Sequence, residues 1–266
     1  INHPTTFEGP LFEDLCRGCA FTLNDDIDFA LVNSIEVQGG PTTTTSANVG
    51  VSGPPGAIEN PFTGTAIDYW EARLSEGFKI TATSGADARG HEDLVPGVSG
   101  HGSSSTALCY GDNDGVINRV RVQQAIKNGC AIVKTFGTNH SPHVEMTTTD
   151  TAGNAITYGG ELAVTGTATA TMQLTITGAS NQSLYMIQNG NEIATAVICD
   201  GVPLTSPAVI AGDDVSCSVT LTRAASGDGP LGTFWRFDIK KREPATTVAP
   251  VEIRTLIANP VFLFDG

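Results

Sequence analysis

The sequence predicts a chain in two parts: an α/β portion over residues 1–140, followed by an all-β, sandwich-like portion over residues 141–266. Apolar residues at helical spacing occur only in the first part. Runs of alternating or β-branched residues, separated by turn signals, fill the second part. A length of 266 residues allows one large domain or two of ordinary size.

Short strands are expected in the first portion. One β-favouring run ends at Val37, and two more cover residues 78–83 and 104–110. Residues 38–66 are rich in Gly, Pro, Thr and Ser and show no periodicity. They are therefore expected to form a long loop, which inside a domain is usually functional or mobile.

Two helices are expected between these strands. The first precedes Gly77, which stands where a C-terminal cap belongs. The second spans residues 115–128, with Asp114 as its cap and Gly129 as its stop. The apolar residues that define the two helices are Ile67, Trp70 and Leu74 in the first and Val116, Val120 and Ile126 in the second.

The second portion has the pattern of an antiparallel β-sandwich. Asn189-Gly190 is typical of a tight hairpin turn. Trp235, the one aromatic residue here that a sugar-binding site would use, is expected in the core. The predicted strand runs are 161–177, 183–198, 215–224, 233–241 and 251–264.

The amino-acid composition disfavours some classes of binding partner. The formal net charge is -14, and charged residues make up 16% of the chain against about 25% in an average protein. Because phosphate and anionic lipid contacts need a positive face, nucleic acid and membrane surfaces are disfavoured. The basic run 240–242 is interpreted as a solvated strand end. No stretch is long and apolar enough to span a membrane.

The six cysteines allow fifteen disulfide pairings. Local spacing suggests that each bridge joins two cysteines close in the sequence, and bridges imply a secreted, extracellular or periplasmic protein. A zinc site at the first C-x-x-C would lack a second such pair. The chain begins without Met or a signal peptide, so it is expected to be processed or part of something longer. The suggested pairs are Cys16–Cys19, Cys109–Cys130 and Cys199–Cys217.

Asp87 and the histidines are the candidate chemical groups. Asp87 follows a predicted strand, and a carboxylate at the carboxyl end of a strand is well placed for metal binding or catalysis in α/β proteins. The alternative is a turn aspartate that hydrogen-bonds its own backbone. Neutral imidazole is the commonest metal ligand, although a histidine in a surface loop usually has no such role. The five histidines are His3, His91, His101, His140 and His143.

Several segments, taken in order, resemble the PHP metallohydrolases, in particular the carbaryl-hydrolase and microcin-processing branch. The opening Asn2-His3-Pro4 resembles the family's N-H-P strand end, and residues 83–89 fall where the family has G-x-S-D-x-H. The other similar segments are 33–40, 69–77, 125–133, 235–238 and 257–262.

This resemblance implies a partial PHP-type β/α barrel before the sandwich, and a site for zinc, manganese or iron that activates water against a phosphoester, ester or carbamate. His3 and Asp87 match ligand positions, and His91 would serve as a ligand after a loop shift. Arg89 replaces the final ligand histidine. A guanidinium cannot ligate a metal, so Arg89 would instead bind an anionic substrate.

Two functions follow from this pattern. In the first, a missing N-terminal half or a separate chain completes the metal site of a secreted hydrolase. In the second, the PHP scaffold has lost its metal and serves as an extracellular structural, surface or assembly protein that needs no cofactor. The sequence leaves open which of these holds, and whether the chain is an enzyme.

Overall fold

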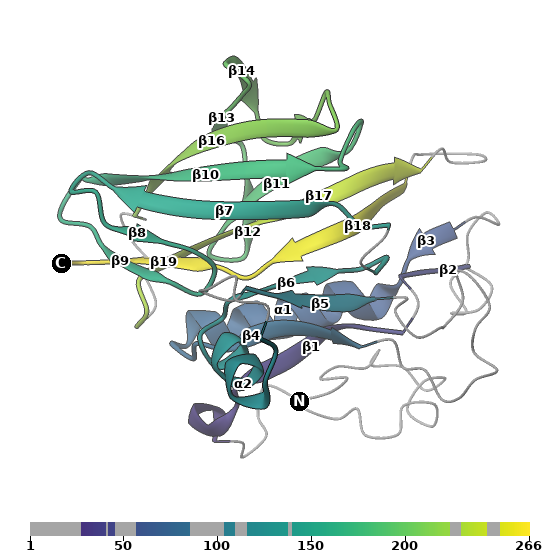
Figure 1. The fold of residues 1–266 in the computed structure, drawn as a ribbon, viewed down its shortest axis with the longest axis horizontal. Helices are drawn as coiled ribbons and strands as arrows, with labels where there is room; N and C mark the ends of the chain where they lie inside the picture. Colours follow the sequence, from purple (N-terminus) through teal and green to yellow (C-terminus); the bar gives the residue numbers. More distant parts are fainter. Residues whose placement is uncertain are drawn as a thin grey trace.

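The structure has three layers (Figure 1). A six-stranded sheet and a nine-stranded sheet stack face to face, and a small α/β layer covers the other face of the nine-stranded sheet. The computed structural model describes residues 28–40, 42–45, 57–85, 104–109, 116–137, 140–223, 230–243 and 251–266.

The six-stranded sheet is antiparallel throughout, in the order β14-β13-β16-β10-β7-β8. Its long strands alternate buried and exposed residues, as expected for a sheet with one face in the core and one in solvent. The strands are β7 (His143–Asp150), β8 (Ala155–Ile156), β10 (Thr169–Thr177), β13 (Ala196–Cys199), β14 (Val202–Thr205) and β16 (Asp214–Thr222).

The nine-stranded sheet runs in the order β12-β11-β17-β18-β6-β5, with β15 on β11, β19 on β17 and β9 on β19. Among the described strand pairs of this sheet, β9 with β19 is parallel and the others are antiparallel. The strands are β5 (Ser105–Leu108), β6 (Ala131–Lys134), β9 (Glu161–Ala163), β11 (Ser183–Gln188), β12 (Asn191–Ile193), β15 (Ala208–Val209), β17 (Thr233–Glu243), β18 (Val251–Ala258) and β19 (Val261–Phe264).

The α/β layer is built around a parallel pair, β1 (Ser34–Gly39) and β4 (Thr81–Gly85), joined by helix α1 (Pro61–Ser75). Asn60 caps α1 by accepting a hydrogen bond from the Phe62 N–H at 3.1 Å, and Gly77 follows its C-terminus with φ +97°. The remaining elements are η1 (Phe29–Leu31), β2 (Thr43–Thr45), β3 (Ala57–Glu59) and α2 (Arg119–Lys127).

The main core lies between the two sheets. Met172, Leu174 and Val219 from the six-stranded sheet pack with Met186 and Phe237 from the nine-stranded sheet. All five side chains are at most 1% exposed. The second portion is therefore a β-sandwich, as predicted, and the Asn189-Gly190 turn joins β11 to β12 with both residues at positive φ.

A second core joins the α/β layer to the nine-stranded sheet. Trp70 of α1 is fully buried, and Ile35 of β1 packs in the same cluster as Phe234 of β17. The side chain of Asn259 adds a polar link: its amide bonds both the N–H and the C=O of Ala82 in β4 and the C=O of Ala131 in β6. One side chain thus satisfies backbone groups from two layers.

Strand β17 faces both cores. Phe237 points into the sandwich, while the alternate residues Arg236 and Asp238 point toward the α/β layer and are 3% and 0% exposed. Arg236 Nε donates to Glu71 Oε1 of α1 at 2.6 Å, and its Nη1 donates to Asp238. Arg254 of β18 donates from Nε to the other Asp238 oxygen at 3.0 Å.

Arg254 extends this chain of ion pairs to β3. Its Nη1 donates to Glu59 Oε2, and its backbone N–H donates to Glu59 Oε1 at 2.8 Å. We call Glu59, Glu71, Arg236, Asp238 and Arg254 the buried ion network. Its members come from α1, β3, β17 and β18, so the network connects the α/β layer to the sandwich.

Two predicted disulfides are present. Cys109–Cys130 joins the end of β5 to the start of β6, and Cys199–Cys217 joins β13 to β16. Such bridges are typical of an oxidising compartment. Cys16 and Cys19 lie outside the described residues. No helix in the described ranges is long and apolar enough to cross a membrane.

Three sequence predictions need correction. Residues 38–66 are not one loop, because β2, β3 and the first turn of α1 lie within them. The second helix begins at Arg119, capped by Asn118, so Val116 precedes it. Lys240 is not a solvated strand end: it is 9% exposed, its Nζ bonds Glu192, and it lies 4.0 Å from the Tyr185 ring centroid.

The predicted β/α barrel is not seen in the described ranges. The first portion supplies one parallel pair, β1 with β4, whereas β5 and β6 pair antiparallel and join the nine-stranded sheet. That sheet takes strands from both sides of residue 140, and the domain boundary there stays a prediction. Trp235 lies in the core, as expected, at 2% exposure.

Replacing Arg236 should destabilise the fold strongly. Arg236→Met leaves Glu71 and Asp238 as buried carboxylates short of a partner, which typically costs about 3–5 kcal/mol. Urea unfolding measures the loss. Arg242→Met, an exposed arginine on the same strand, is the control and should cost less than about 0.5 kcal/mol. Equal losses would show that the network does not hold the layers together.

Asp238 should make stability depend on acid pH. Burial alone would raise the pKa of Asp238, but the Arg236 and Arg254 guanidiniums outweigh burial and hold its pKa below the usual 3.8. Ionised Asp238 therefore stabilises the fold above the unfolded-state pKa, and this contribution is lost as pH falls toward the lower folded-state pKa.

The difference in unfolding free energy between wild type and Asp238→Asn isolates this residue from the other carboxylates. It should be constant above about pH 5 and should shrink as pH falls below the ordinary pKa of an aspartate. Urea unfolding across a pH series measures it. A difference that stays constant down to about pH 3 would contradict the assigned direction.

The Cys199–Cys217 bridge should stabilise the sandwich through the unfolded chain. The two cysteines are 18 residues apart, and closing a loop of that size contributes about 3 kcal/mol. Replacing both with Ala should lower the unfolding free energy by about that amount. Ile198→Ala, at an exposed neighbour on β13, is the control for local packing. Similar losses in the two proteins would rule out a specific role for the bridge.

Candidate functional site

The carboxyl ends of β1 and β4 meet at one edge of the α/β layer. Gly39 lies opposite Gly85 in the parallel register, and the Gly40 N–H donates to the Gly85 carbonyl at 3.0 Å. In α/β proteins, ligands bind outside the carboxyl ends of parallel strands. We call this place the β1–β4 edge and take it as the candidate site.

Glu36 is an acidic side chain at this edge. It stands in β1 between the fully buried residues Ile35 and Val37 and is itself 9% exposed. A side chain at Gly85 would collide with the Glu36 Oε1 atom, so the carboxylate reaches across to the last residue of β4. Glycine at position 85 leaves the space that this carboxylate occupies.

Gln38 ties the edge to α1. It is fully buried; its Oε1 accepts from the Thr63 hydroxyl at 2.7 Å, and its Nε2 donates to the Gly40 carbonyl at 3.3 Å. Thr63 is 2% exposed. Since the amide has a partner on each side, it fixes the end of β1 and the first turns of α1 relative to each other.

The nine-stranded sheet supports the edge from its other side. The Ser84 N–H donates to the Thr106 hydroxyl of β5 at 2.8 Å, and the Ser104 hydroxyl donates to the Gly85 carbonyl at 2.8 Å. The end of β4 is therefore hydrogen-bonded to β1 and to the β5 segment. A rigid frame of this kind is what a precise site needs.

Three of the predicted site residues follow this edge closely in sequence. Asp87 is two residues beyond Gly85, the last residue of β4. Asp87, Arg89 and His91 lie outside the described residues, and so do His3 and His101. Their roles as ligands or as an anion-binding group stay predictions.

The two described histidines are not brought to the β1–β4 edge. His143 begins β7 in the six-stranded sheet, is exposed, and lies 3.9 Å from the Glu145 carboxylate. His140 is exposed in the turn that precedes β7. Within the described ranges, no three side chains among His, Cys, Asp and Glu group as metal ligands would.

Among the described residues, Glu36 supplies a carboxylate at this edge, within a polar, hydrogen-bonded frame. A catalytic metal normally takes three or more protein ligands. The described residues alone do not supply that set. A metal held here would need ligands from the segments that contain His3, Asp87 and His91.

Glu36 was not singled out by sequence reasoning as a site residue. One feature of β1 points to Glu36. It is a glutamate flanked by apolar residues, in a strand whose positions 35–38 are all buried. Such a residue is unusual, because a buried carboxylate is costly unless it is paired. The pattern alone could not show that Gly85 makes room for this side chain, since that requires the register of β1 against β4.

Comparison with known proteins leaves the family of this chain open. No family model, no curated protein and no solved structure matches it. The PHP resemblance therefore rests on the sequence segments themselves, and the fold and the site rest on the geometry given above.

Proposed function

We propose that this chain is part of a secreted PHP-like metal-dependent hydrolase that acts on a phosphoester, ester or carbamate. One observation carries the proposal. The β1–α1–β4 unit brings Glu36 of β1 and Gly85, the last residue of β4, to the same edge of a parallel strand pair. That is the arrangement in which α/β proteins bind ligands.

In this proposal His3, Asp87 and His91 hold a divalent zinc, manganese or iron ion, and Arg89 binds an anionic part of the substrate. The ion, when bound, would lower the pKa of a water molecule and polarise the substrate. The frame of Gln38, Thr63 and Thr106 keeps the strand ends fixed, and a missing N-terminal half or a second chain adds the remaining ligands.

The alternative is an extracellular protein derived from the same scaffold but without catalysis. The polar groups at the β1–β4 edge favour this non-catalytic alternative. Gln38, Ser84 and Ser104 already hydrogen-bond other parts of the protein. In that case the edge is structural, no cofactor is needed, and the sandwich serves a surface or assembly role.

Metal content and hydrolysis separate the two functions. The full-length protein, loaded with Zn²⁺, Mn²⁺ or Fe²⁺, is assayed for bound metal and for cleavage of p-nitrophenyl phosphate and acetate. Asp87→Asn and His3→Ala should each weaken metal binding roughly tenfold or more, because each removes a ligand. Hydrolysis should fall with the metal.

Two variants serve as matched controls. His143→Ala removes an exposed histidine from the six-stranded sheet, and Asp265→Asn removes an exposed carboxylate near the C-terminus. Both should keep the metal and the activity of the wild type. If the full-length protein holds no stoichiometric metal and cleaves neither ester after metal addition, the enzyme proposal fails and the structural alternative stands.

A further inference from the structure

The two described disulfides have similar positions in their sheets. Cys199 lies opposite Cys217 in the antiparallel register of β13 and β16. Cys109 and Cys130 extend the antiparallel pairing of β5 and β6, and the Cys109 N–H donates to the Cys130 carbonyl at 3.0 Å. The bridged cysteines are 18 and 21 residues apart. A difference in their reactivity must therefore come from their surroundings.

The surroundings of the two bridges differ in burial. Cys199 and Cys217 are 6% and 0% exposed and belong to the main core between the two sheets. We call their bond the core disulfide. Cys109 and Cys130 are both partly exposed and line a groove of about 890 Å³, and we call their bond the groove disulfide. A reagent in solvent can reach the groove disulfide in the folded protein, whereas the core disulfide reacts only after the sandwich opens.

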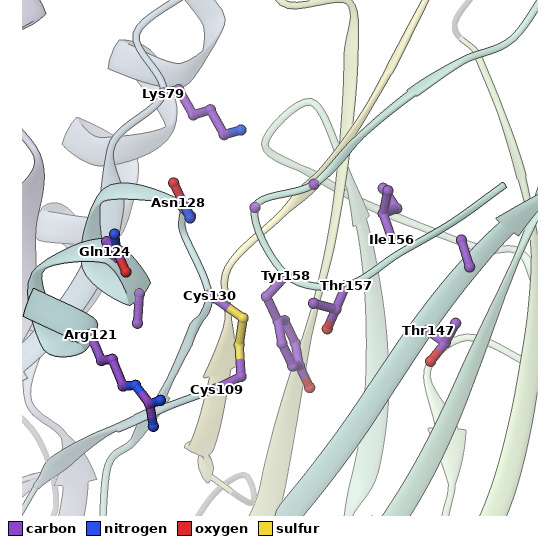
Figure 2. Close-up of a pocket in the computed structure, with 14 residues that line it drawn as sticks. Lys79, Cys109, Arg121, Gln124, Asn128, Cys130, Thr147, Ile156, Thr157 and Tyr158 are labelled. Carbon is purple, nitrogen blue, oxygen red and sulfur yellow. A yellow bond between two sulfur atoms is a disulfide. The ribbon is translucent and has the colours of Figure 1, made fainter. Parts of the chain in front are cut away.

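The groove leaves room for an attacking thiol. It lies between helix α2 and the turn that joins β8 to β9 (Figure 2). In this view the groove disulfide lies between Gln124 of α2 and Tyr158 of the turn. Small-molecule sites commonly have volumes of roughly 300–1,000 Å³, so a thiol side chain and the group that carries it fit in this groove.

Both walls of the groove are held in place. The Tyr158 hydroxyl donates to the Val144 carbonyl at 2.9 Å, which fixes one wall to β7. A side chain on Gly159, whose φ is +72°, would collide with the Asn128 carbonyl oxygen. The end of α2 therefore packs directly on the β8–β9 turn. Access to the groove disulfide does not require either wall to move.

The groove disulfide also secures strand β5. This strand is last at one end of the described order of the nine-stranded sheet, and it pairs with β6 over the four residues Ser105–Leu108. The groove disulfide closes this pairing at its C-terminal end. Without the bond, a four-residue pairing would hold β5 to β6, and short strands at the end of a sheet open locally at little cost.

Strand β5 in turn holds the end of β4, beside which it lies in Figure 1. The Ser84 N–H donates to the Thr106 hydroxyl at 2.8 Å, and the neighbouring Ser104 hydroxyl donates to the Gly85 carbonyl at 2.8 Å. The groove disulfide is therefore linked, through β5, to the β1–β4 edge. This link does not depend on whether the chain is a hydrolase.

We propose that the groove disulfide is a redox-modification site, opened by a dithiol reductant, and that its opening loosens the end of β4. A thiolate of the reductant attacks one sulfur of the bridge; the S–S bond breaks, a mixed disulfide forms, and the released sulfur takes up a proton. The second thiol of the reductant, once deprotonated, displaces the other cysteine sulfur, which is also protonated. Two electrons and two protons pass to the chain, and the reductant becomes a disulfide.

Selective reduction of the folded chain tests the first step. The full chain is incubated with dithiothreitol without denaturant and alkylated with iodoacetamide, and peptide mass spectrometry identifies the labelled cysteines. Cys109 and Cys130 should be labelled roughly tenfold faster or more than Cys199 and Cys217, because exposed disulfides are the labile ones and the core disulfide must wait for the sandwich to open. Equal rates, or faster labelling of the core pair, would overturn the proposal.

Hydrogen exchange measures the second step. After selective reduction, the Ser84 amide should exchange roughly tenfold faster, because β5 has lost the bond that holds it beside β4. The amides of β10, at the centre of the six-stranded sheet, should keep their protection. Reoxidation with oxidised glutathione should restore the protection of Ser84, which irreversible damage to the fold would not allow. Unchanged exchange at Ser84 after reduction would overturn the link to β4.

Two double variants serve as a matched pair. Cys109→Ala with Cys130→Ala should speed exchange at Ser84 without any reductant, while the amides of β10 stay protected. Cys199→Ala with Cys217→Ala should instead lower the protection of β10 and leave the local opening at Ser84 unchanged. The same exchange pattern in both variants would contradict a special role for the groove disulfide. No measurement here depends on metal or hydrolysis, so failure of this proposal is distinct from failure of the proposed hydrolase.

Discussion

The arrangement of the three layers depends on the charged face of β17. Its apolar residues enter the sandwich core, while Arg236 and Asp238 are buried against the α/β layer. Buried charges are costly unless their partners are placed to meet them. Glu71, Glu59 and Arg254 meet that requirement from α1, β3 and β18. The α/β layer can therefore dock in few other ways without leaving a charge unpaired.

This constraint concerns specificity more than stability. A well-packed apolar cluster in place of buried ion pairs is often as stable, whereas a cluster with one partner missing is not. The apolar contacts of Trp70 and Phe234 would tolerate small shifts of α1, since dispersion has little directionality. The Arg236–Glu71 bond does not tolerate them. It fixes α1, and through the Gln38–Thr63 bond α1 fixes the end of β1.

The sequence was most informative where local physics decides the structure. The Asn189-Gly190 hairpin, the helix before Gly77 and two disulfides follow from turn chemistry, helical spacing and loop length. The sequence was least informative where a contact with a residue distant in sequence determines the environment of a side chain. The run 240–242 looked solvated because nothing nearby reveals that Glu192 and Tyr185 cover Lys240. Glu36 was missed for the same reason, since its neighbour Gly85 lies in another strand.

Contacts with the sandwich fix the geometry of the β1–β4 edge. Ser84 and Gly85 are held by Thr106 and Ser104, which belong to the segment around β5, and β5 is paired to β6 within the nine-stranded sheet. Asn259, between β18 and β19, holds β4 two residues before Ser84. The all-β portion is thus a support for the α/β edge and not an independent appendage. The end of β4 is thus positioned by Thr106, 22 residues from its partner Ser84, and by Asn259, 177 residues from its partner Ala82. No local sequence pattern could reveal this dependence on distant contacts.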